Sequence, residues 1–260
     1  MTASPLRRRI RFAGWTALTA LVLGLIVFLI WTQLVMPADR AAAQAVFDNP
    51  AVTVTDTPDS VVLAPTEDAS DVGLVFIPGA RVDPYAYLAT LAGTVETTGM
   101  TVVITKPTLN LAFFDQRPLE TFTAAAPDVA TWFVGGHSLG GVRACMMAND
   151  NQGDNQGDEQ VVGLVLFGSY CASAVDDDLA VLSISGSEDG LSTPATITDA
   201  AHLLPADSTF VQIIGANHAS FGAYGAQPGD GVATISPTAA EQAITDALDL
   251  FVAQTLTQSE

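Results

Sequence analysis

An uncharged run of 25 residues, from Phe12 to Met36, is the feature that most restricts how this chain folds. As a helix it would be roughly 37 Å long, enough to cross a bilayer core of about 30 Å. Trp15 and Trp31 lie near its two ends, where aromatic rings favour the membrane interface. Basic flanks of such helices stay in the cytoplasm, and four arginines precede this one: Arg7, Arg8, Arg9 and Arg11. The sequence therefore predicts a cytoplasmic basic tail over 1–11, a transmembrane helix over 12–36, and a single-pass membrane protein whose remaining chain is extracytoplasmic.

A cleavable signal peptide is the alternative interpretation of this segment. The small residues Ala41, Ala42 and Ala43 offer a cleavage site after the basic and apolar regions. The apolar run is, however, longer than the 7 to 15 residues of an ordinary signal peptide, which favours an uncleaved anchor. Both interpretations export the rest of the chain.

The charge of the exported part excludes one class of partner. The chain has 28 acidic and 9 basic residues, a net charge of −19. The part of the chain after residue 36 contains five basic residues and all 28 acidic residues, which gives it a net charge of −23. Such a surface repels phosphate backbones, so we expect no nucleic-acid partner. With 49% hydrophobic residues the chain is expected to fold, as an alanine-rich stalk over 37–50 followed by one domain over 51–260.

Within that domain, short apolar runs alternate with longer amphipathic stretches, which is typical of an α/β fold with a mostly parallel sheet. Eight strands are predicted, at 52–55, 60–64, 72–77, 101–105, 132–135, 161–167, 180–185 and 209–214. Helices are predicted at 84–97, 117–125, 139–148, 194–204 and 238–255. Residues 150–159, which repeat Asn-Gln-Gly-Asp, are expected to form a solvated connection.

One of these strands runs into the pentapeptide Gly136-His-Ser-Leu-Gly140, and a helix pattern follows it. This G-x-S-x-G pattern between a strand and a helix is typical of a nucleophile elbow, a strained turn that exposes a serine hydroxyl. The glycines are needed because the turn leaves no room for side chains beside the serine. We therefore predict that Ser138 is a catalytic nucleophile.

A serine hydroxyl needs a base to remove its proton, and the chain has three histidines. His137 precedes Ser138 inside the turn and is expected to support the loop. His202 lies in an amphipathic helix pattern and is expected at the surface. His218 lies in a loop of small and polar residues after the last strand, where the base is found when the chain order is Ser, acid, His.

The acid that orients this base should follow a strand that lies between the two residues in the chain. Asp189 and Glu188 compete for this role after the strand at 180–185, and Asp189, which precedes a glycine turn, is the preferred candidate. The carboxylates at 176–178 precede that strand and lie at its wrong end.

Acyl transfer also needs hydrogen-bond donors for the developing oxyanion. One is expected from the backbone N–H of Leu139, the residue after the nucleophile. The second is expected from the loop at 76–81, with Ala80 preferred and Arg81 next. No metal or organic cofactor is implied, because the sequence lacks Cys/His clusters and a G-x-G-x-x-G fingerprint. Cys145 and Cys171 are either buried thiols or, in an oxidising compartment, one disulfide.

Taken together, these motifs resemble the α/β-hydrolase superfamily, and most closely its fold-5 branch, which is similar to dienelactone hydrolases. The matching segments, in chain order, are 76–79, 82–87, 136–141, 186–190, 217–222 and 227–231. The resemblance implies Ser138 as nucleophile, Asp189 as acid and His218 as base. Dienelactone hydrolases proper use a cysteine where this chain has Ser138, so their particular substrate does not carry over. Only 12 residues, 168–179, separate the strands at 161–167 and 180–185, where this fold often inserts a lid, so no large lid is expected.

The expected function is that of a membrane-anchored, extracytoplasmic serine hydrolase resembling carboxylesterases, which cleaves an ester of a small molecule or of an envelope component. Two alternatives stay open. The same site, without a cofactor, could serve a perhydrolase, haloperoxidase or lactonase reaction. The domain could also be a tethered binding module that has lost turnover.

Overall fold

The eight predicted strands all form, and they join in a single sheet. The computed structural model describes residues 5–151 and 160–258, so residues 152–159 of the connection predicted at 150–159 lie outside the described residues. The strands are β1 (Val52–Asp56), β2 (Ser60–Pro65), β3 (Val72–Ile77), β4 (Thr101–Thr105), β5 (Thr131–His137), β6 (Gln160–Phe167), β7 (Ala180–Gly186) and β8 (Thr209–Ile213). Their order is β1-β2-β4-β3-β5-β6-β7-β8. β2 runs antiparallel to β1 and β4, and every other pair is parallel, which confirms the mostly parallel sheet.

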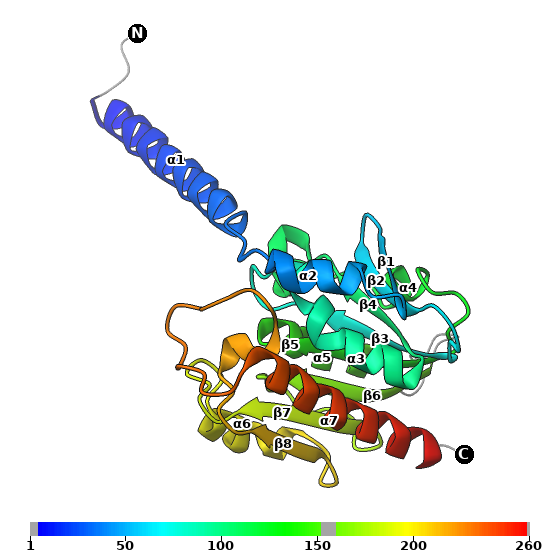
Figure 1. The fold of residues 1–260 in the computed structure, drawn as a ribbon. Coiled ribbons are helices and arrows are strands. Elements are labelled where there is room, and N and C mark those ends of the chain that lie inside the picture. Colours follow the sequence, from blue (N-terminus) through cyan, green and yellow to red (C-terminus); the bar gives the residue numbers. More distant parts are fainter. Residues whose placement is uncertain (1–4, 152–159, 259–260) are drawn as a thin grey trace.

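β3 and β4 are buried along their whole length because helices cover both faces of the sheet (Figure 1). One core contains the buried side chains of α2 (Arg40–Phe47), α3 (Leu88–Thr98) and α7 (Pro237–Gln258). The other core lies against α5 (Leu139–Asp150). Because the parallel strands share one direction, their carboxyl ends meet at one edge of the sheet, which lies to the left in Figure 1.

The remaining helices are short. The predicted helix at 84–97 is a 3-10 turn, η1 (Pro84–Tyr87), followed by α3, and the one at 194–204 divides into α6 (Pro194–Ala200) and η5 (Ala201–Leu203). The helix predicted at 117–125 shrinks to α4 (Glu120–Thr123), since Pro127 disfavours helical backbone in the residue before it. Three further 3-10 turns are η2 (Thr108–Asn110), η3 (Ala112–Phe114) and η6 (His218–Phe221).

Residues 37–50 differ from the predicted stalk. Within them α2 begins after Asp39, whose carboxylate accepts hydrogen bonds from the backbone N–H groups of Ala41 and Ala42. Val46 is 5% exposed and belongs to the core that also contains α3. The alanine-rich segment is thus part of the domain, because its small residues allow a close approach to the neighbouring helix.

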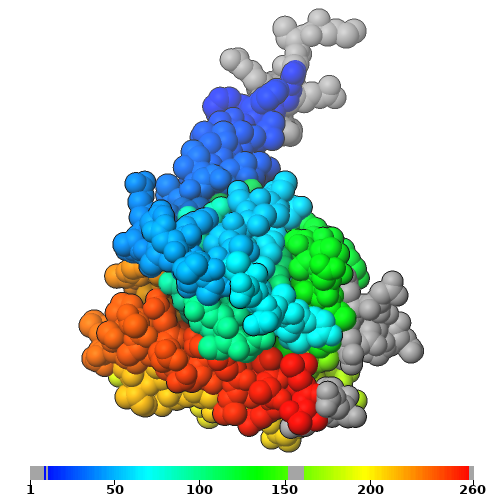
Figure 2. All heavy atoms as spheres, turned by 45° about the vertical axis from the view of Figure 1, so that its right-hand side comes forward, coloured from blue at the N-terminus to red at the C-terminus, as the bar shows by residue number. Residues whose placement is uncertain are grey.

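The N-terminal helix, α1 (Pro5–Thr32), projects from the domain and meets it only at its C-terminal end (Figures 1 and 2). Its apolar part, Arg11–Thr32, has 22 residues and leaves its side chains outside the protein core. At about 1.5 Å per residue this part is roughly 33 Å long, enough for a bilayer core. By length and composition, the helix fits a membrane anchor or a signal sequence.

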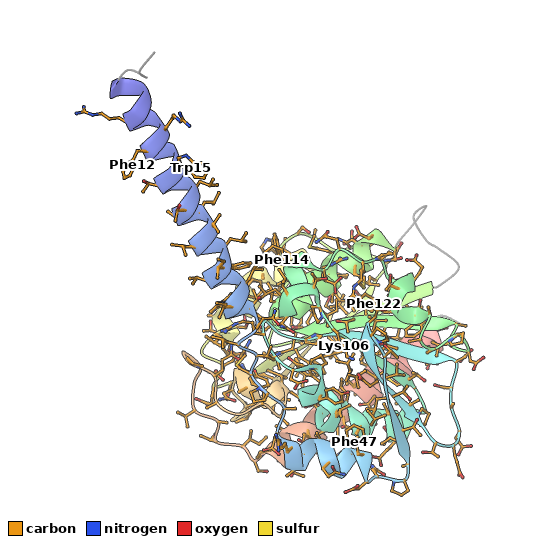
Figure 3. The ribbon with its side chains drawn as sticks, turned by 90° about the horizontal axis from the view of Figure 1, so that it is seen from above. Phe12, Trp15, Phe47, Lys106, Phe114 and Phe122 are labelled. Atoms are coloured by element: carbon orange, nitrogen blue, oxygen red, sulfur yellow. A yellow bond between two sulfur atoms is a disulfide. The ribbon has the colours of Figure 1, made fainter. Side chains whose placement is uncertain are left out.

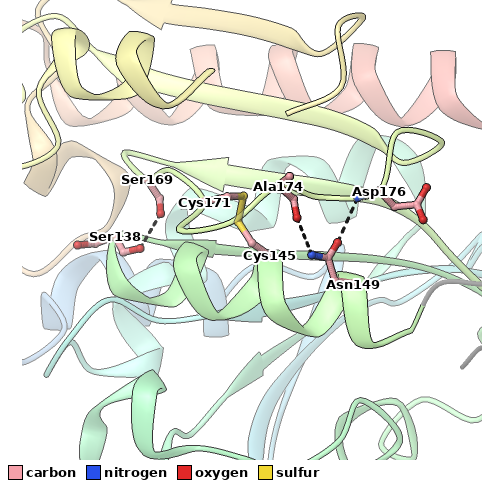
Figure 4. The surroundings of a disulfide bond; sticks show 7 residues. All are labelled: Ser138, Cys145, Asn149, Ser169, Cys171, Ala174 and Asp176. Carbon is pink, nitrogen blue, oxygen red and sulfur yellow. Dashed lines mark hydrogen bonds between the residues drawn. A yellow bond between two sulfur atoms is a disulfide. The ribbon is translucent and has the colours of Figure 1, made fainter. Parts of the chain in front are cut away.

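A disulfide joins Cys145 in α5 to Cys171, which follows β6 (Figure 4). The same segment is also held by Asn149 of α5, whose side-chain amide donates to the carbonyl of Ala174 and whose side-chain oxygen accepts from the N–H of Asp176. This connection between β6 and β7 is short and forms no lid. The disulfide therefore fixes the chain after β6 against the helix that begins at Ser138.

We expect removal of this disulfide to lower the stability of the domain. The two cysteines are 26 residues apart. A cross-link over a loop of that length lowers the conformational entropy of the unfolded chain, which raises the free energy of unfolding by about 3 kcal/mol. Urea unfolding of the full-length chain in detergent should show a loss of that order for the C145A/C171A double variant. Dithiothreitol should destabilise the wild type and leave the variant unchanged; equal stability of the two proteins without reductant would contradict the expectation.

Candidate active site

The serine singled out by the sequence lies in a strained turn between β5 and α5. Ser138 has φ 53° and ψ −124°, a backbone conformation that L residues rarely adopt. A Cβ atom at Gly140 would lie 2.0 Å from the carbonyl oxygen of Ile77, so only glycine fits there. Ser138 is partly exposed, whereas the glycine and the strand before it are buried. These features are those of a nucleophile elbow.

Two hydrogen bonds from the chain after β6 fix this turn. The N–H of Ser138 donates to the carbonyl of Phe167, at 3.0 Å. The hydroxyl of Ser169, which is 1% exposed, donates to the carbonyl of Ser138 at 2.7 Å (Figure 4). Sequence analysis missed Ser169, because nothing in the local sequence marks a serine that acts 31 residues away.

The structure brings the predicted base and acid together in the buried interior. His218 Nδ1 lies 2.8 Å from Asp189 Oδ2, and both side chains are buried. Asp189 Oδ1 accepts two backbone hydrogen bonds, from the N–H groups of Leu191 at 2.8 Å and Ser192 at 2.7 Å. With the proton on Nδ1, the tautomer that an acid–histidine pair requires, this contact is a hydrogen bond that His218 donates to the carboxylate. The other ring nitrogen, Nε2, then carries a lone pair.

That second nitrogen is buried and has no hydrogen-bond partner in the described part of the chain. The His218 ring lies 4.4 Å, between centroids, from the ring of His137, the residue before Ser138. No hydrogen bond from the Ser138 hydroxyl to His218 is formed in the structure. Catalytic hydrogen bonds of this kind are often long without substrate and shorten when substrate binds.

The alternative candidates lie elsewhere. Glu188 is exposed, and its carboxylate accepts a hydrogen bond from the hydroxyl of Ser187. His202 is exposed on η5, where its ring contacts the carbonyl of Asp199. Over residues 5–151 and 160–258, no three His, Cys, Asp or Glu side chains are grouped so as to hold a metal ion.

A carboxylate that the sequence analysis did not single out joins the loop of Asp189 to the loop of His218. Asp230 Oδ1 accepts hydrogen bonds from the N–H groups of His218 and Gly190, both at 3.1 Å. Its Oδ2 accepts from the N–H of Ala219 at 2.9 Å. Asp230 thus holds the loop that carries Asp189 against the loop that carries His218. Its place in the matching segment 227–231 was the signal that could have identified it.

Both predicted oxyanion donors have a backbone N–H that makes no hydrogen bond within the described residues. Leu139 begins α5, where the first amides have no partner inside the helix. Ala80 lies in the loop after β3, which packs against the elbow. The competing candidate, Arg81, uses its N–H to bond the carbonyl of Asn110 at 2.7 Å. The available amides are therefore those of Leu139 and Ala80.

His137 supports this loop through a buried tyrosine. The hydroxyl of Tyr87 accepts a hydrogen bond from the N–H of Gly79 at 2.9 Å and lies 2.9 Å from His137 Nδ1. Burial and the neighbouring His218 hold the pKa of His137 well below its usual range, so the imidazole is neutral and its Nδ1 accepts a hydrogen bond from the tyrosine hydroxyl. Burial raises the pKa of Tyr87, which keeps its hydroxyl protonated. The side chain of Tyr87 thus joins the elbow to the loop that carries Gly79 and Ala80.

Substitution of Tyr87 by phenylalanine should weaken both stability and turnover. It leaves the N–H of Gly79 and a nitrogen of His137 buried without partners, which costs roughly 1–3 kcal/mol. Urea unfolding should report this loss, and kcat for an ester substrate should fall with little change in KM. The neighbouring Tyr85→Phe, at a partly exposed tyrosine, is the control, and equal effects of the two substitutions would argue against this role.

Comparisons with known proteins agree with this architecture. The structure is similar to the esterase domain of a protein from Rhodothermus marinus, with a TM-score of 0.54 and 13% identity, over 78% of this chain and 98% of that one. It is similar to an esterase from Thermogutta terrifontis, with a TM-score of 0.51 and 13% identity, over 79% and 94% of the two chains. A serine hydrolase without a lid from Xanthomonas campestris gives a TM-score of 0.50 and 15% identity, over 77% and 94%.

At these identities the structural likeness establishes the fold, and no protein of curated function matches the sequence. The family is established by the sequence itself, since the pattern of the alpha/beta hydrolase family matches residues 73–242, well over half of the chain. This stretch includes the elbow, the Asp189–His218 pair and Asp230. With its eight-stranded, mostly parallel sheet and its lack of a lid, the chain belongs to the alpha/beta hydrolase family.

Proposed function

We propose that this protein is a serine hydrolase that cleaves a carboxylic ester through an acyl-enzyme intermediate. The observation that carries the proposal is the state of His218. Its Nδ1 lies 2.8 Å from the carboxylate of Asp189, while its buried Nε2, beside the strained turn of Ser138, has no hydrogen-bond partner among the described residues. A buried nitrogen without a hydrogen-bond partner costs free energy. A hydrogen bond from the hydroxyl of Ser138 to Nε2 removes this cost and gives the path along which the proton is transferred.

The reaction follows from these positions. Ser138 Oγ attacks the ester carbonyl while His218 Nε2 takes its proton, and Asp189 stabilises the resulting imidazolium. The N–H groups of Leu139 and Ala80 stabilise the negative oxygen of the tetrahedral intermediate. Its collapse breaks the bond to the alcohol, which leaves with the proton from His218. Water then attacks the acyl-Ser138 ester by the same steps and releases the carboxylic acid.

We also propose that α1 is an uncleaved anchor, with the catalytic domain on the extracytoplasmic side. The arginines before the apolar segment favour a cytoplasmic N-terminus. Cleavage near Ala41–Ala43 would cut α2 in its first turn and separate it from Asp39, which caps this helix and donates its N–H to the carbonyl of Ala223. The disulfide between Cys145 and Cys171 suits an oxidising compartment.

We expect the full-length protein to react with a fluorophosphonate probe at Ser138. Mass spectrometry of the adduct should locate the label, and labelling should vanish in Ser138→Ala and His218→Ala. His202→Ala, at an exposed histidine, should label as the wild type does. A folded wild type that takes no label, or that takes it at another residue, would refute the proposal and favour a tethered binding domain.

A second substitution tests the acid. Asp189→Asn should lower kcat for p-nitrophenyl acetate by roughly 10³ to 10⁴-fold, because the amide no longer orients the imidazole in the reactive tautomer. Glu188→Gln changes the adjacent, exposed carboxylate and should leave kcat within about twofold. Similar losses in both variants would show that Asp189 has no special place beside His218.

A further inference from the structure

The C-terminal end of α1 is bonded directly to the loop that carries the proposed oxyanion donor Ala80. The guanidinium of Arg81 lies 4.2 Å above the ring of Trp31, and its Nη1 donates to the carbonyl of Leu34 at 3.0 Å. The backbone of Met36 exchanges two hydrogen bonds with this loop, to Arg81 at 2.7 Å and from Asp83 at 3.0 Å. The domain therefore sits directly on the end of the helix, without a flexible linker between them.

The adjacent turn, η3, presents two aromatic rings to the solvent beside the same helix. Phe113 is 67% exposed and Phe114 is 43% exposed, and their rings lie edge to face. Phe114 lies near the end of α1 (Figure 3), and its ring is 5.8 Å from that of Phe28 in this helix. Phe28 is four residues before the end of the helix, about 6 Å along its axis. In a bilayer spanned by α1, these rings lie at the depth of its last apolar turn.

The contacts of Arg81 with the end of α1 and the contact of Phe114 with Phe28 belong to one connected unit at the edge of the proposed active site. The carbonyl of Asn110, just before η3, accepts the hydrogen bond from the N–H of Arg81. The side-chain amide of Asn110 donates to the carbonyl of Thr32, the last residue of α1, at 3.0 Å. The aromatic turn, the end of the helix and the oxyanion loop thus share a single side of the domain. This side continues to the carboxyl edge of the sheet, from which α1 leaves in Figure 1.

The charge of the domain narrows the kind of membrane molecule that can approach. Beyond residue 36 the chain carries a net charge of −23, which repels anionic headgroups. Uncharged lipids meet no such repulsion, and their apolar chains can contact Phe113 and Phe114. An ester linkage in such a lipid lies at the membrane interface, the level at which these rings are placed.

We propose, building on the serine hydrolase function above, that the substrate is a carboxylic ester of an uncharged lipid in the leaflet that faces the domain. The lipid reaches Ser138 from the bilayer across Phe113 and Phe114. Ser138 takes the acyl chain, the lipid alcohol leaves with the proton from His218, and water releases the fatty acid. The anchor then serves to hold the oxyanion loop at the membrane surface, where the substrate resides.

The position of the aromatic turn is tested without reference to catalysis. Both native cysteines are disulfide-bonded, so a cysteine introduced at Phe113 accepts a thiol-reactive NBD fluorophore alone. In full-length F113C reconstituted into vesicles, NBD emission should be blue-shifted and quenched by nitroxide-labelled lipid. The control is F210C, at a 50% exposed phenylalanine of the edge strand β8. Equal emission and quenching at the two positions would overturn the proposal.

The substrate class is tested in vesicles of diether phosphatidylcholine, whose lipids contain no carboxylic ester. The wild type should release oleate from embedded dioleoylglycerol, and faster than from dioleoylphosphatidylglycerol. The F113S/F114S variant should lower the ratio of the dioleoylglycerol rate to the p-nitrophenyl acetate rate by about tenfold, and F210S should leave this ratio unchanged. A protein that hydrolyses p-nitrophenyl acetate and takes the fluorophosphonate label, but does not cleave dioleoylglycerol, overturns the lipid substrate alone. Failure of labelling and of both hydrolyses refutes the proposed function and this inference with it.

Discussion

The strained backbone of Ser138 is the constraint on which the rest of the site depends. A residue held at φ 53° costs about 1–3 kcal/mol and persists only where its surroundings hold it. Here the hydrogen bond to Phe167, the hydroxyl of Ser169 and the close contact of Gly140 with Ile77 fix the turn from three sides. The strain directs the serine toward the carboxyl edge of the sheet and starts α5 with an unused amide. The serine proposed as nucleophile and the amide proposed as oxyanion donor are therefore products of one turn.

Asp189 and His218, the proposed acid and base, are positioned by backbone amides. Asp189 accepts two of them and Asp230 accepts several more, so each carboxylate is solvated by the protein itself. Because these amides belong to both loops, the distance between His218 and Asp189 is fixed before any substrate binds. Such preorganisation spares the reaction the cost of reorienting dipoles as charge develops. Within this design Asp230 is a positioning residue, since it touches the loops and not the reacting atoms.

The C-terminal end of the N-terminal helix α1 is in direct contact with the domain. Hydrogen bonds and a cation–π contact join its last turn to the loop beside Ala80, and α2 continues from it into the core of the domain. An independent domain on a flexible stalk would sample many orientations relative to a membrane. The observed contacts hold the domain in one orientation relative to α1, with the aromatic side chains of η3 beside the helix. The end of α1 and the loop beside Ala80 are in this way parts of one structural unit.

The sequence by itself determined the features that depend on local patterns. These are the membrane-length apolar segment, the eight strands, the elbow at Ser138 and, by elimination among three histidines, His218 as the partner of an acid near 189. Only the tertiary structure decided the contacts between distant residues. These are the hydrogen bonds of Asp230, the hydrogen bond from the N–H of Arg81 to the carbonyl of Asn110, and the packing of 37–50 against the core. The physical reason is that periodicity and glycine spacing act over a few residues. A hydrogen bond across 40 residues, such as that from Gly190 to Asp230, leaves no local pattern and exists only once the chain has folded.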